Sequence, residues 1–276
     1  MKVALLQMTS SDVVERNLDV VVDAVHHAAS QGADWLLTPE VTNCLSASRS
    51  RQRDVLATEA RDITLKTIQQ EAKDRRINVL IGSLALKAEG DGAPFVNRSV
   101  LVDKTGSITA RYDKIHMFDV DISARETYRE SAGYQPGDRA VLASVDGARV
   151  GLSICYDIRF PGLYRALALG GAKVLTVPAA FSPETGVAHW EALLRARAIE
   201  TGCYVIAPAQ TGTHPTTQGR QRATYGHSMV IDPWGRVIVD AGTEPGVFIA
   251  DIDLNLVDDC RRRLPSLSHG RDFEGP

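Results

Sequence analysis

Short apolar runs alternate with amphipathic stretches over the first part of the chain. Val3–Met8 is a largely apolar run typical of a buried strand, and the apolar residues of Glu15–Ser30 recur on one helical face. Gly32 follows that segment as a helix stop. Further runs predict strands at Trp35–Thr38 and Asn78–Ser83 and a helix from about Thr58 to Arg75.

The middle of the chain predicts a hairpin followed by a long connection. The turn sequence Asp103-Lys104-Thr105-Gly106 separates Asn97–Val102 from Ile108–Tyr112, which are expected to pair as antiparallel strands. Residues 113–139 then carry many charges, together with Pro136-Gly137. A connection of that length in a compact domain is usually functional or disordered.

The second half returns to alternating strands and helices. Strands are predicted within Ala140–Ile154 and at Lys173–Val177, Cys203–Ala209, Ser228–Asp232, Arg236–Asp240 and Val247–Asp251. Helices are predicted at Phe160–Leu169, at Ala188–Thr201 and from Leu254. This order favours an α/β fold whose sheets are covered by helices. Because no linker, repeat or change of composition interrupts the chain, we expect one domain over residues 1–276.

The composition is that of a globular chain without a polyanionic partner. The 276 residues are 44% hydrophobic and 24% charged, and their formal net charge is −3, which disfavours binding to nucleic acid. No apolar stretch approaches the length of a membrane span, and the apolar start is too short for a signal peptide. We therefore expect no membrane partner.

The four cysteines are widely scattered, at Cys44, Cys155, Cys203 and Cys260. Their spacing fits neither a disulfide framework nor a zinc site, which favours a reducing, cytoplasmic compartment. No other ligand cluster is evident, and neither a phosphate-binding GxxxxGK[ST] motif nor a GxGxxG motif opens a helix after a strand. The sequence therefore predicts no metal or nucleotide cofactor.

Cys155 lies where a strand turns into a helix. It ends the apolar run Val150–Ile154 and precedes the helical stretch that begins near Phe160. A side chain at such a turn is exposed at the strand end, and the backbone N–H groups that follow it can hold an oxyanion. A lone cysteine is more often a buried structural residue, so only the groups around Cys155 can show whether it is a nucleophile.

Two further polar groups end apolar runs. Glu40 follows Trp35–Pro39, and Lys114 follows the second strand of the hairpin. Ligands bind at the carboxyl ends of strands in α/β sheets, so these groups could converge with Cys155. A carboxylate can accept the thiol proton, an ammonium group can hold an oxyanion, and a thiol can form a thioester. Together they favour a nucleophilic hydrolase.

These residues, in their order and context, resemble the Glu–Lys–Cys triad of the nitrilase superfamily of carbon–nitrogen hydrolases. The resemblance covers nearly the whole chain. Its motifs are Leu37-Thr38-Pro39-Glu40, Tyr112-Asp113-Lys114-Ile115-His116 and Cys155-Tyr156-Asp157-Ile158-Arg159-Phe160-Pro161. It implies an amidase that works through a thioester, a four-layer α-β-β-α sandwich, and a homodimer or larger homo-oligomer.

Two more segments are similar to the deaminated glutathione amidase branch, to which the omega-amidases are closely related. These segments are residues 188–200 and 225–235. The resemblance therefore implies a small amide substrate carrying a carboxylate, with omega-amidase activity as the alternative.

The family also uses a second glutamate, which orients the lysine and the attacking water. Glu130 lies at the family's spacing before Pro136-Gly137, and Glu126 is a neighbouring candidate. The stretch from Arg125 to Arg129 has no counterpart in the family pattern, so the sequence does not predict the shape of the pocket entrance.

Four residues are candidates for substrate binding. The backbone N–H of Tyr156 is an oxyanion donor, and Arg159 is placed to bind a carboxylate through a bidentate fork. Phe181 lies in a segment that lines the pocket in the resembled branches, and Thr185 could add a hydroxyl. The alternatives are a surface arginine, a core phenylalanine and a turn threonine.

Two other functions stay open at this stage. A cysteine–histidine hydrolase would need His116 or His189 within hydrogen-bond reach of Cys155. A non-catalytic binding protein on the same scaffold would be expected to lack one of the three triad residues.

Overall fold

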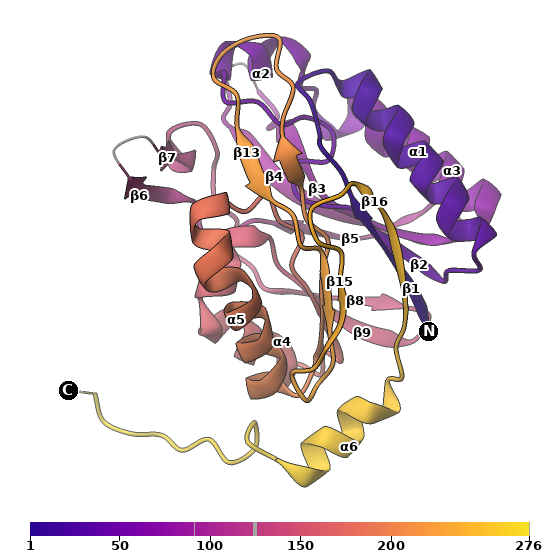
Figure 1. Ribbon diagram of the computed structural model, residues 1–276, viewed down its shortest axis with the longest axis vertical. Coiled ribbons are helices and arrows are strands. Elements are labelled where there is room, and N and C mark those ends of the chain that lie inside the picture. The colour runs from indigo at the N-terminus through magenta and orange to yellow at the C-terminus, as the bar shows by residue number, and fades with distance from the viewer. Residues whose placement is uncertain (91, 124–125, 276) are drawn as a thin grey trace.

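Two six-stranded sheets face each other at the centre of the protein, as a computed structural model shows for residues 1–90, 92–123 and 126–275 (Figure 1). The first sheet has the order β16-β1-β2-β3-β4-β5 and the second the order β15-β14-β11-β10-β9-β8. The strands of the first are β1 (Lys2–Gln7), β2 (Trp35–Leu37), β3 (Asn78–Lys87), β4 (Phe95–Val102), β5 (Ile108–Asp113) and β16 (Gly246–Asp251). Those of the second are β8 (Val141–Val145), β9 (Ala148–Leu152), β10 (Val174–Thr176), β11 (Tyr204–Ala207), β14 (Met229–Ile231) and β15 (Val237–Asp240).

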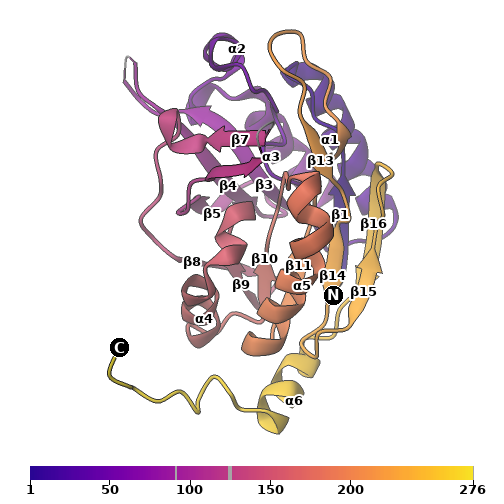
Figure 2. The same ribbon diagram turned by 60° about the vertical axis from the view of Figure 1, so that its left-hand side comes forward.

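Helices cover the outer face of each sheet, so that the protein has four layers (Figures 1 and 2). Helices α1 (Val14–Ser30) and α3 (Ile63–Arg75) lie on the first sheet, and α4 (Pro161–Leu169) and α5 (Pro183–Thr201) lie on the second. A short α2 (Arg49–Val55) lies at the end of the sheets, and α6 (Asn255–Arg263) leads into an extended C-terminal segment. The expected α-β-β-α sandwich is confirmed.

The alternation of side chains along the strands explains this layering. In β1, Val3 and Leu5 pack into the core between the sheets, whereas Ala4 and Leu6 pack against α1 and α3. Successive side chains of a strand point to opposite faces, so a strand buried on both faces must be apolar throughout. The continuous apolar runs of the sequence are therefore explained by two buried faces.

Each sheet is built on three parallel strands, which brings their carboxyl ends to one edge. Strands β1, β2 and β3 are parallel in the first sheet, and β9, β10 and β11 are parallel in the second. Gly82 in β3 permits a close approach there, because a Cβ atom at this position would lie 2.5 Å from Pro178 Cβ and 2.6 Å from the Pro39 carbonyl oxygen.

Several predicted boundaries were wrong. The helix expected from Thr58 begins only at Ile63, because Asp62 caps it by accepting the Leu65 N–H at 2.8 Å, and a 3-10 turn (Glu59–Arg61) precedes it. Helix α5 begins earlier than predicted, with a proline in its first turn.

The connection expected at 113–139 is not wholly irregular. It contains a hairpin of β6 (Asp119–Ser123) and β7 (Glu126–Arg129), followed by a 3-10 turn at Glu130–Ala132. Arg125, part of the stretch without a family counterpart, lies outside the described residues. A second unpredicted hairpin joins β12 (Thr211–Thr213) to β13 (Ala223–Tyr225). In the described part of the chain, no helix has both the length and the apolar character needed to cross a membrane.

Candidate active site

The ends of three strands bring Glu40, Lys114 and Cys155 into one cavity. Glu40 follows β2, Lys114 follows β5 and Cys155 follows β9, and all three side chains line the same hollow. The Lys114 ammonium nitrogen lies 3.0 Å from Glu40 Oε1. The two side chains are 2% and 6% exposed, so this ion pair is almost entirely removed from water.

The carboxylate of Glu40 is fixed by donors from three parts of the chain. Its Oε1 accepts a hydrogen bond from Asn97 Nδ2 at 2.9 Å as well as from Lys114, and its Oε2 accepts the Ala180 N–H at 2.8 Å. The Glu40 carbonyl oxygen accepts from Gln210 Nε2 at 2.9 Å. A carboxylate held at both oxygens keeps one orientation, as a proton acceptor requires.

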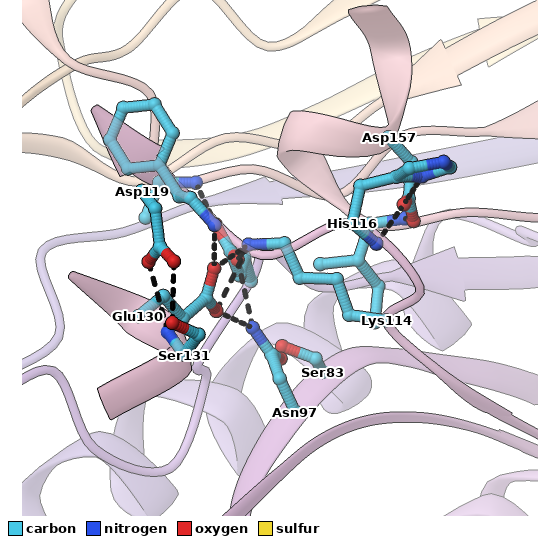
Figure 3. Close-up of polar contacts among 12 residues, drawn as sticks. Ser83, Asn97, Lys114, His116, Asp119, Glu130, Ser131 and Asp157 are labelled. Atoms are coloured by element: carbon cyan, nitrogen blue, oxygen red, sulfur yellow. Dashed lines mark hydrogen bonds and ion pairs between the residues drawn. The ribbon is translucent and has the colours of Figure 1, made fainter. Parts of the chain in front are cut away.

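Glu130 is the second carboxylate of the site (Figure 3). Its oxygens lie 2.8 and 3.1 Å from Lys114 Nζ, and it accepts the Phe118 N–H at 2.7 Å. Glu126, the other candidate, instead accepts a hydrogen bond from Tyr128 on the β6–β7 hairpin. Lys114 is therefore held between Glu40 and Glu130.

Cys155 has a backbone conformation that most residues avoid. Its φ of 48° lies in the left-handed region, and its N–H donates to the Pro178 carbonyl oxygen at 2.9 Å. A 3-10 turn then runs over Cys155–Arg159 into α4. Non-glycine residues in this region are strained and are often found at functional sites. The turn expected at the end of the apolar run is therefore present.

The carboxylate of Asp157 holds this turn in place through hydrogen bonds. Its buried carboxylate accepts the Ile154 N–H at 2.8 Å, the Tyr112 hydroxyl at 2.7 Å and the His116 N–H at 3.0 Å. The His116 ring also contacts it, with Nδ1 2.6 Å from Oδ1 (Figure 3). Asp157 therefore ties the nucleophile turn to the strand that precedes Lys114.

Burial and charge set the protonation of the three groups. Burial raises the pKa of the Cys155 thiol well above its usual value, and the Glu40 charge raises it further. Burial also raises the pKa of Glu40, but the positive charges of Lys114 and Arg222 outweigh this effect and lower it overall. Burial lowers the pKa of Lys114, but the charges of Glu130 and Glu40 outweigh it and hold that pKa well above its usual value. The resting site therefore holds a neutral thiol beside a carboxylate and an ammonium group.

The cavity around these groups has a volume of about 450 Å³. A smaller hollow of about 10 Å³ also borders Cys155. Cys155 and Phe118 line both. The larger cavity is lined by Glu40, Val41, Cys44, Leu45, Ser46, Ala47, Arg49, Gln52, Asn97, Lys114, Phe118, Thr127, Tyr128, Arg129, Glu130, Tyr134, Cys155, Arg220, Gln221 and Arg222.

The four predicted substrate-binding residues gather at the smaller hollow. Tyr156, Phe181 and Thr185 line it, and the Arg159 guanidinium packs 5.5 Å from the centre of the Phe181 ring and 5.9 Å from that of Tyr156. Arg159 Nη2 lies 3.3 Å from His189 Nδ1. No ion pair joins Arg159 to a carboxylate among the described residues.

The histidines considered in the sequence are engaged elsewhere. His116 contacts Asp157 and stacks on Phe160 at a centroid distance of 3.5 Å, and His189 contacts Arg159. Neither lines the cavities described here. The geometry therefore disfavours a cysteine–histidine hydrolase. The described residues also hold no group of three or more His, Cys, Asp or Glu side chains arranged to bind a metal ion.

Three residues of the site were not predicted as such: Asn97, which contacts both carboxylates, Asp157 below the turn, and Arg222 at the cavity wall. Asp157 lies inside the nucleophile motif and could have been noted there. Asn97 and Arg222 reach the site from a strand start and a hairpin, and no local pattern in the sequence identifies them.

The chain resembles known hydrolases in sequence and in structure. The carbon–nitrogen hydrolase family model matches residues 2–262. A deaminated glutathione amidase from Synechocystis is 41% identical over 268 residues, which cover 96% of each chain. The Homo sapiens protein of that name is 38% identical over 98% of this chain and 82% of its own.

Among solved structures, the NitFhit protein of Caenorhabditis elegans superimposes with a TM-score of 0.90 at 36% identity. The match covers 98% of this chain, which spans 65% of the NitFhit chain.

Proposed function

The chain belongs to the carbon–nitrogen hydrolase family, and we propose that it is a cysteine-dependent amidase that releases α-ketoglutarate and cysteinylglycine from deaminated glutathione. The observation that carries the proposal is the buried contact of Lys114 with Glu40 and Glu130 in the cavity that holds Cys155. No added metal or nucleotide has a role in this chemistry.

The first half of the reaction forms a thioester. Glu40 accepts the thiol proton of Cys155, and the thiolate sulfur attacks the amide carbonyl carbon. The carbonyl oxygen becomes an oxyanion, for which Lys114 and the Tyr156 N–H are the donors. When the carbon–nitrogen bond breaks, Glu40 returns its proton to the leaving amine.

The second half hydrolyses the thioester. A water molecule gives a proton to Glu40, and its oxygen attacks the thioester carbonyl. The carbon–sulfur bond then breaks, and Glu40 returns the proton to the sulfur, which restores the thiol and releases the acid. Glu130 assists by orienting Lys114, to which both of its oxygens lie close, and the attacking water.

The larger cavity beside Cys155 and the nearby Arg159 suit a carboxylated amide, whose acyl part needs more room than the smaller hollow of about 10 Å³ provides. Arg159 beside the smaller one is a cation without a carboxylate partner among the described residues, which suits the carboxylate of the acyl part. The larger one, about 450 Å³, falls within the range of about 300–1,000 Å³ typical of small-molecule sites. Ammonia is similar in size to water, which occupies about 30 Å³ in the liquid, so this cavity also has room for a leaving group much larger than ammonia, such as a peptide amine.

The names of the relatives support the same substrate, since bacterial and animal relatives are named deaminated glutathione amidases. Omega-amidase activity, in which α-ketoglutaramate releases ammonia, is the competing assignment. Measuring kcat/KM for both substrates with one enzyme preparation separates them. A preference of tenfold or more for α-ketoglutaramate, about 1.4 kcal/mol, would assign the protein to that activity instead.

Replacing the nucleophile tests the chemistry itself. Cys155→Ala should abolish turnover of deaminated glutathione while the protein stays folded. Cys203→Ala is a matched control, because Cys203 is a buried cysteine that contacts the Ala172 carbonyl oxygen away from the cavity. Turnover that survives in Cys155→Ala would contradict the assignment of the nucleophile. A wild type and a Cys203→Ala variant that both show only the background rate would favour a non-catalytic binding protein.

We also propose a cytoplasmic location and a homodimer. All four cysteines are free and buried, which suits a reducing compartment. Val187 and Ile199 of α5 are 77% and 46% exposed, and such apolar residues on an outer helix suit contact with a second copy of the chain. Sedimentation equilibrium measures the assembly directly, and a monomer at micromolar concentration would contradict the dimer.

A further inference from the structure

Arg222 lies at the wall of the larger cavity, immediately before β13. Its Nη2 donates to the Ala180 carbonyl oxygen at 2.6 Å, and its guanidinium packs 5.1 Å from the centre of the Tyr128 ring. It is half-buried and close enough to Glu40 for its charge to lower the pKa of that carboxyl. Arg222 is therefore held at the reacting end of the cavity.

Arg129 and Arg49 line the same wall, and Arg222 differs from Arg129 in having no partner of opposite charge in the described part of the chain. Arg129 donates to both carboxylate oxygens of Asp121 at 2.8 Å. Arg49 donates to Gln52 and to the carbonyl oxygens of residues 129 and 130. Among the described residues, no ion pair joins Arg222 to a carboxylate, and its Nε is buried without a hydrogen-bond partner. A half-buried guanidinium in this state has the chemistry of an anion-binding group.

The geometry of the reacting groups decides which part of the substrate lies beside Arg222. Glu40, Lys114 and Glu130 line the larger cavity and not the smaller one. Glu40 must reach the leaving nitrogen to protonate it, so the leaving amine occupies the larger cavity. Five cationic residues and two carboxylates line that cavity, a balance that favours an anionic occupant.

We propose that Arg222 binds the carboxylate of the leaving peptide amine. This assignment rests on the proposed function and extends it, because it makes a free carboxylate on the leaving group a determinant of specificity. The acyl carboxylate at Arg159 and the leaving-group carboxylate at Arg222 would then fix the scissile amide at both ends, with Cys155 between them. Such positioning at two ends lowers the entropic cost of bringing the amide to the thiol.

The test compares deaminated glutathione with its C-terminal amide, in which the glycine carboxylate is a carboxamide. Both substrates share the acyl group and the scissile bond, so their kcat/KM values differ only through the leaving-group charge. Wild-type enzyme should prefer the acid by about 10- to 100-fold, the usual range for a charge-assisted hydrogen bond. In Arg222→Gln the ratio of the two kcat/KM values should fall nearly to one, because any effect of the change on Glu40 is common to both substrates and cancels in the ratio.

Arg129→Gln is the matched control, because Arg129 lines the same cavity but is already paired with Asp121. It should retain the full preference for the acid, and Arg222→Lys should retain part of it. An equal loss on both substrates in Arg222→Gln would overturn the proposal, since Arg222 would then act only by holding the Ala180 segment that binds Glu40. A wild-type enzyme that hydrolyses both substrates equally well would overturn it too, with the proposed function intact. A wild-type enzyme that hydrolyses neither would refute the proposed function, and this assignment with it.

Discussion

Replacing Lys114 by methionine would leave the buried carboxylate of Glu40 and the partly buried carboxylate of Glu130 without their shared cation. Lys114 Nζ lies 3.0 Å from Glu40 and 2.8 Å from Glu130, and its side chain is 2% exposed. Removing one partner of a buried ion pair typically costs about 3–5 kcal/mol. In a protein of this size each kcal/mol lowers Tm by about 2–4 °C, so we expect Tm to fall by roughly 6–20 °C at pH 7.

The loss of Tm in Lys114→Met should depend on pH, because Lys114 affects the pKa of Glu40. In the wild type the folded-state pKa of Glu40 is lowered, so its contribution to stability is present above the unfolded value, about 4.3, and is lost as pH falls through the folded value. In Lys114→Met, burial is no longer offset by Lys114, so the pKa of Glu40 should rise. In the folded Lys114→Met protein, Glu40 then takes up a proton as pH falls from 8 to 5. The difference in Tm between this variant and the wild type should therefore become smaller.

Differential scanning calorimetry of both proteins between pH 5 and 8 measures this difference. Lys104→Met is the matched control, because Lys104 forms an exposed ion pair with Asp146 at 2.6 Å and its loss should change Tm very little at any pH. Activity should fall about 10²- to 10³-fold with the loss of one oxyanion donor. A Tm deficit that stays constant or widens toward pH 5 would refute the view that Lys114 compensates the two carboxylates.

Three further outcomes follow from the site. Glu40→Gln should lower kcat about 10²- to 10⁴-fold with an unchanged circular dichroism spectrum, because an amide cannot accept the thiol proton, and a mild effect would point to another base. Arg159→Leu should lower kcat/KM for deaminated glutathione and α-ketoglutaramate by the same factor, since they share the acyl carboxylate; unequal losses would remove Arg159 from the acyl side. Dialysis against a chelator should leave turnover unchanged, and a loss restored by a divalent cation would contradict the proposed mechanism.

The placement of Glu40 and Cys155 could be predicted because each ends an apolar run, whereas Lys114 follows β5, an edge strand of alternating exposure, and was placed by the hairpin that precedes it. A run buried on both faces indicates a central strand, and the carboxyl ends of parallel strands share one edge of a sheet. The alternation of strands and helices likewise predicted most elements of both sheets. These signals are local in sequence, and the fold follows from them directly.

Elements without such a signal were missed. Helix α2 has few apolar residues, and its boundary is set by Ser48, whose Oγ accepts the Arg51 N–H at 3.3 Å. The β6–β7 hairpin is highly charged, and its strands show alternating exposure without a buried face. Asn97 and Arg222 contact Glu40 and its neighbours across long sequence separations, and such contacts depend on the packing of the whole sandwich rather than on any local pattern.

The two cations near Glu40 lead to a last expectation, which rests on the assignment of Arg222. Lys114 and Arg222 both lower the pKa of Glu40 in the free protein. A substrate carboxylate bound at Arg222 would offset one of these charges, so the pKa of Glu40 should be higher in the complex. The acid limb of kcat reports the complex and that of kcat/KM reports the free enzyme, so the limb of kcat should lie at higher pH. With the C-terminal amide of the substrate, the acid limbs of kcat and kcat/KM should lie at the same pH. Limbs that coincide for the acid substrate would show that the leaving-group carboxylate does not act on Glu40 through Arg222.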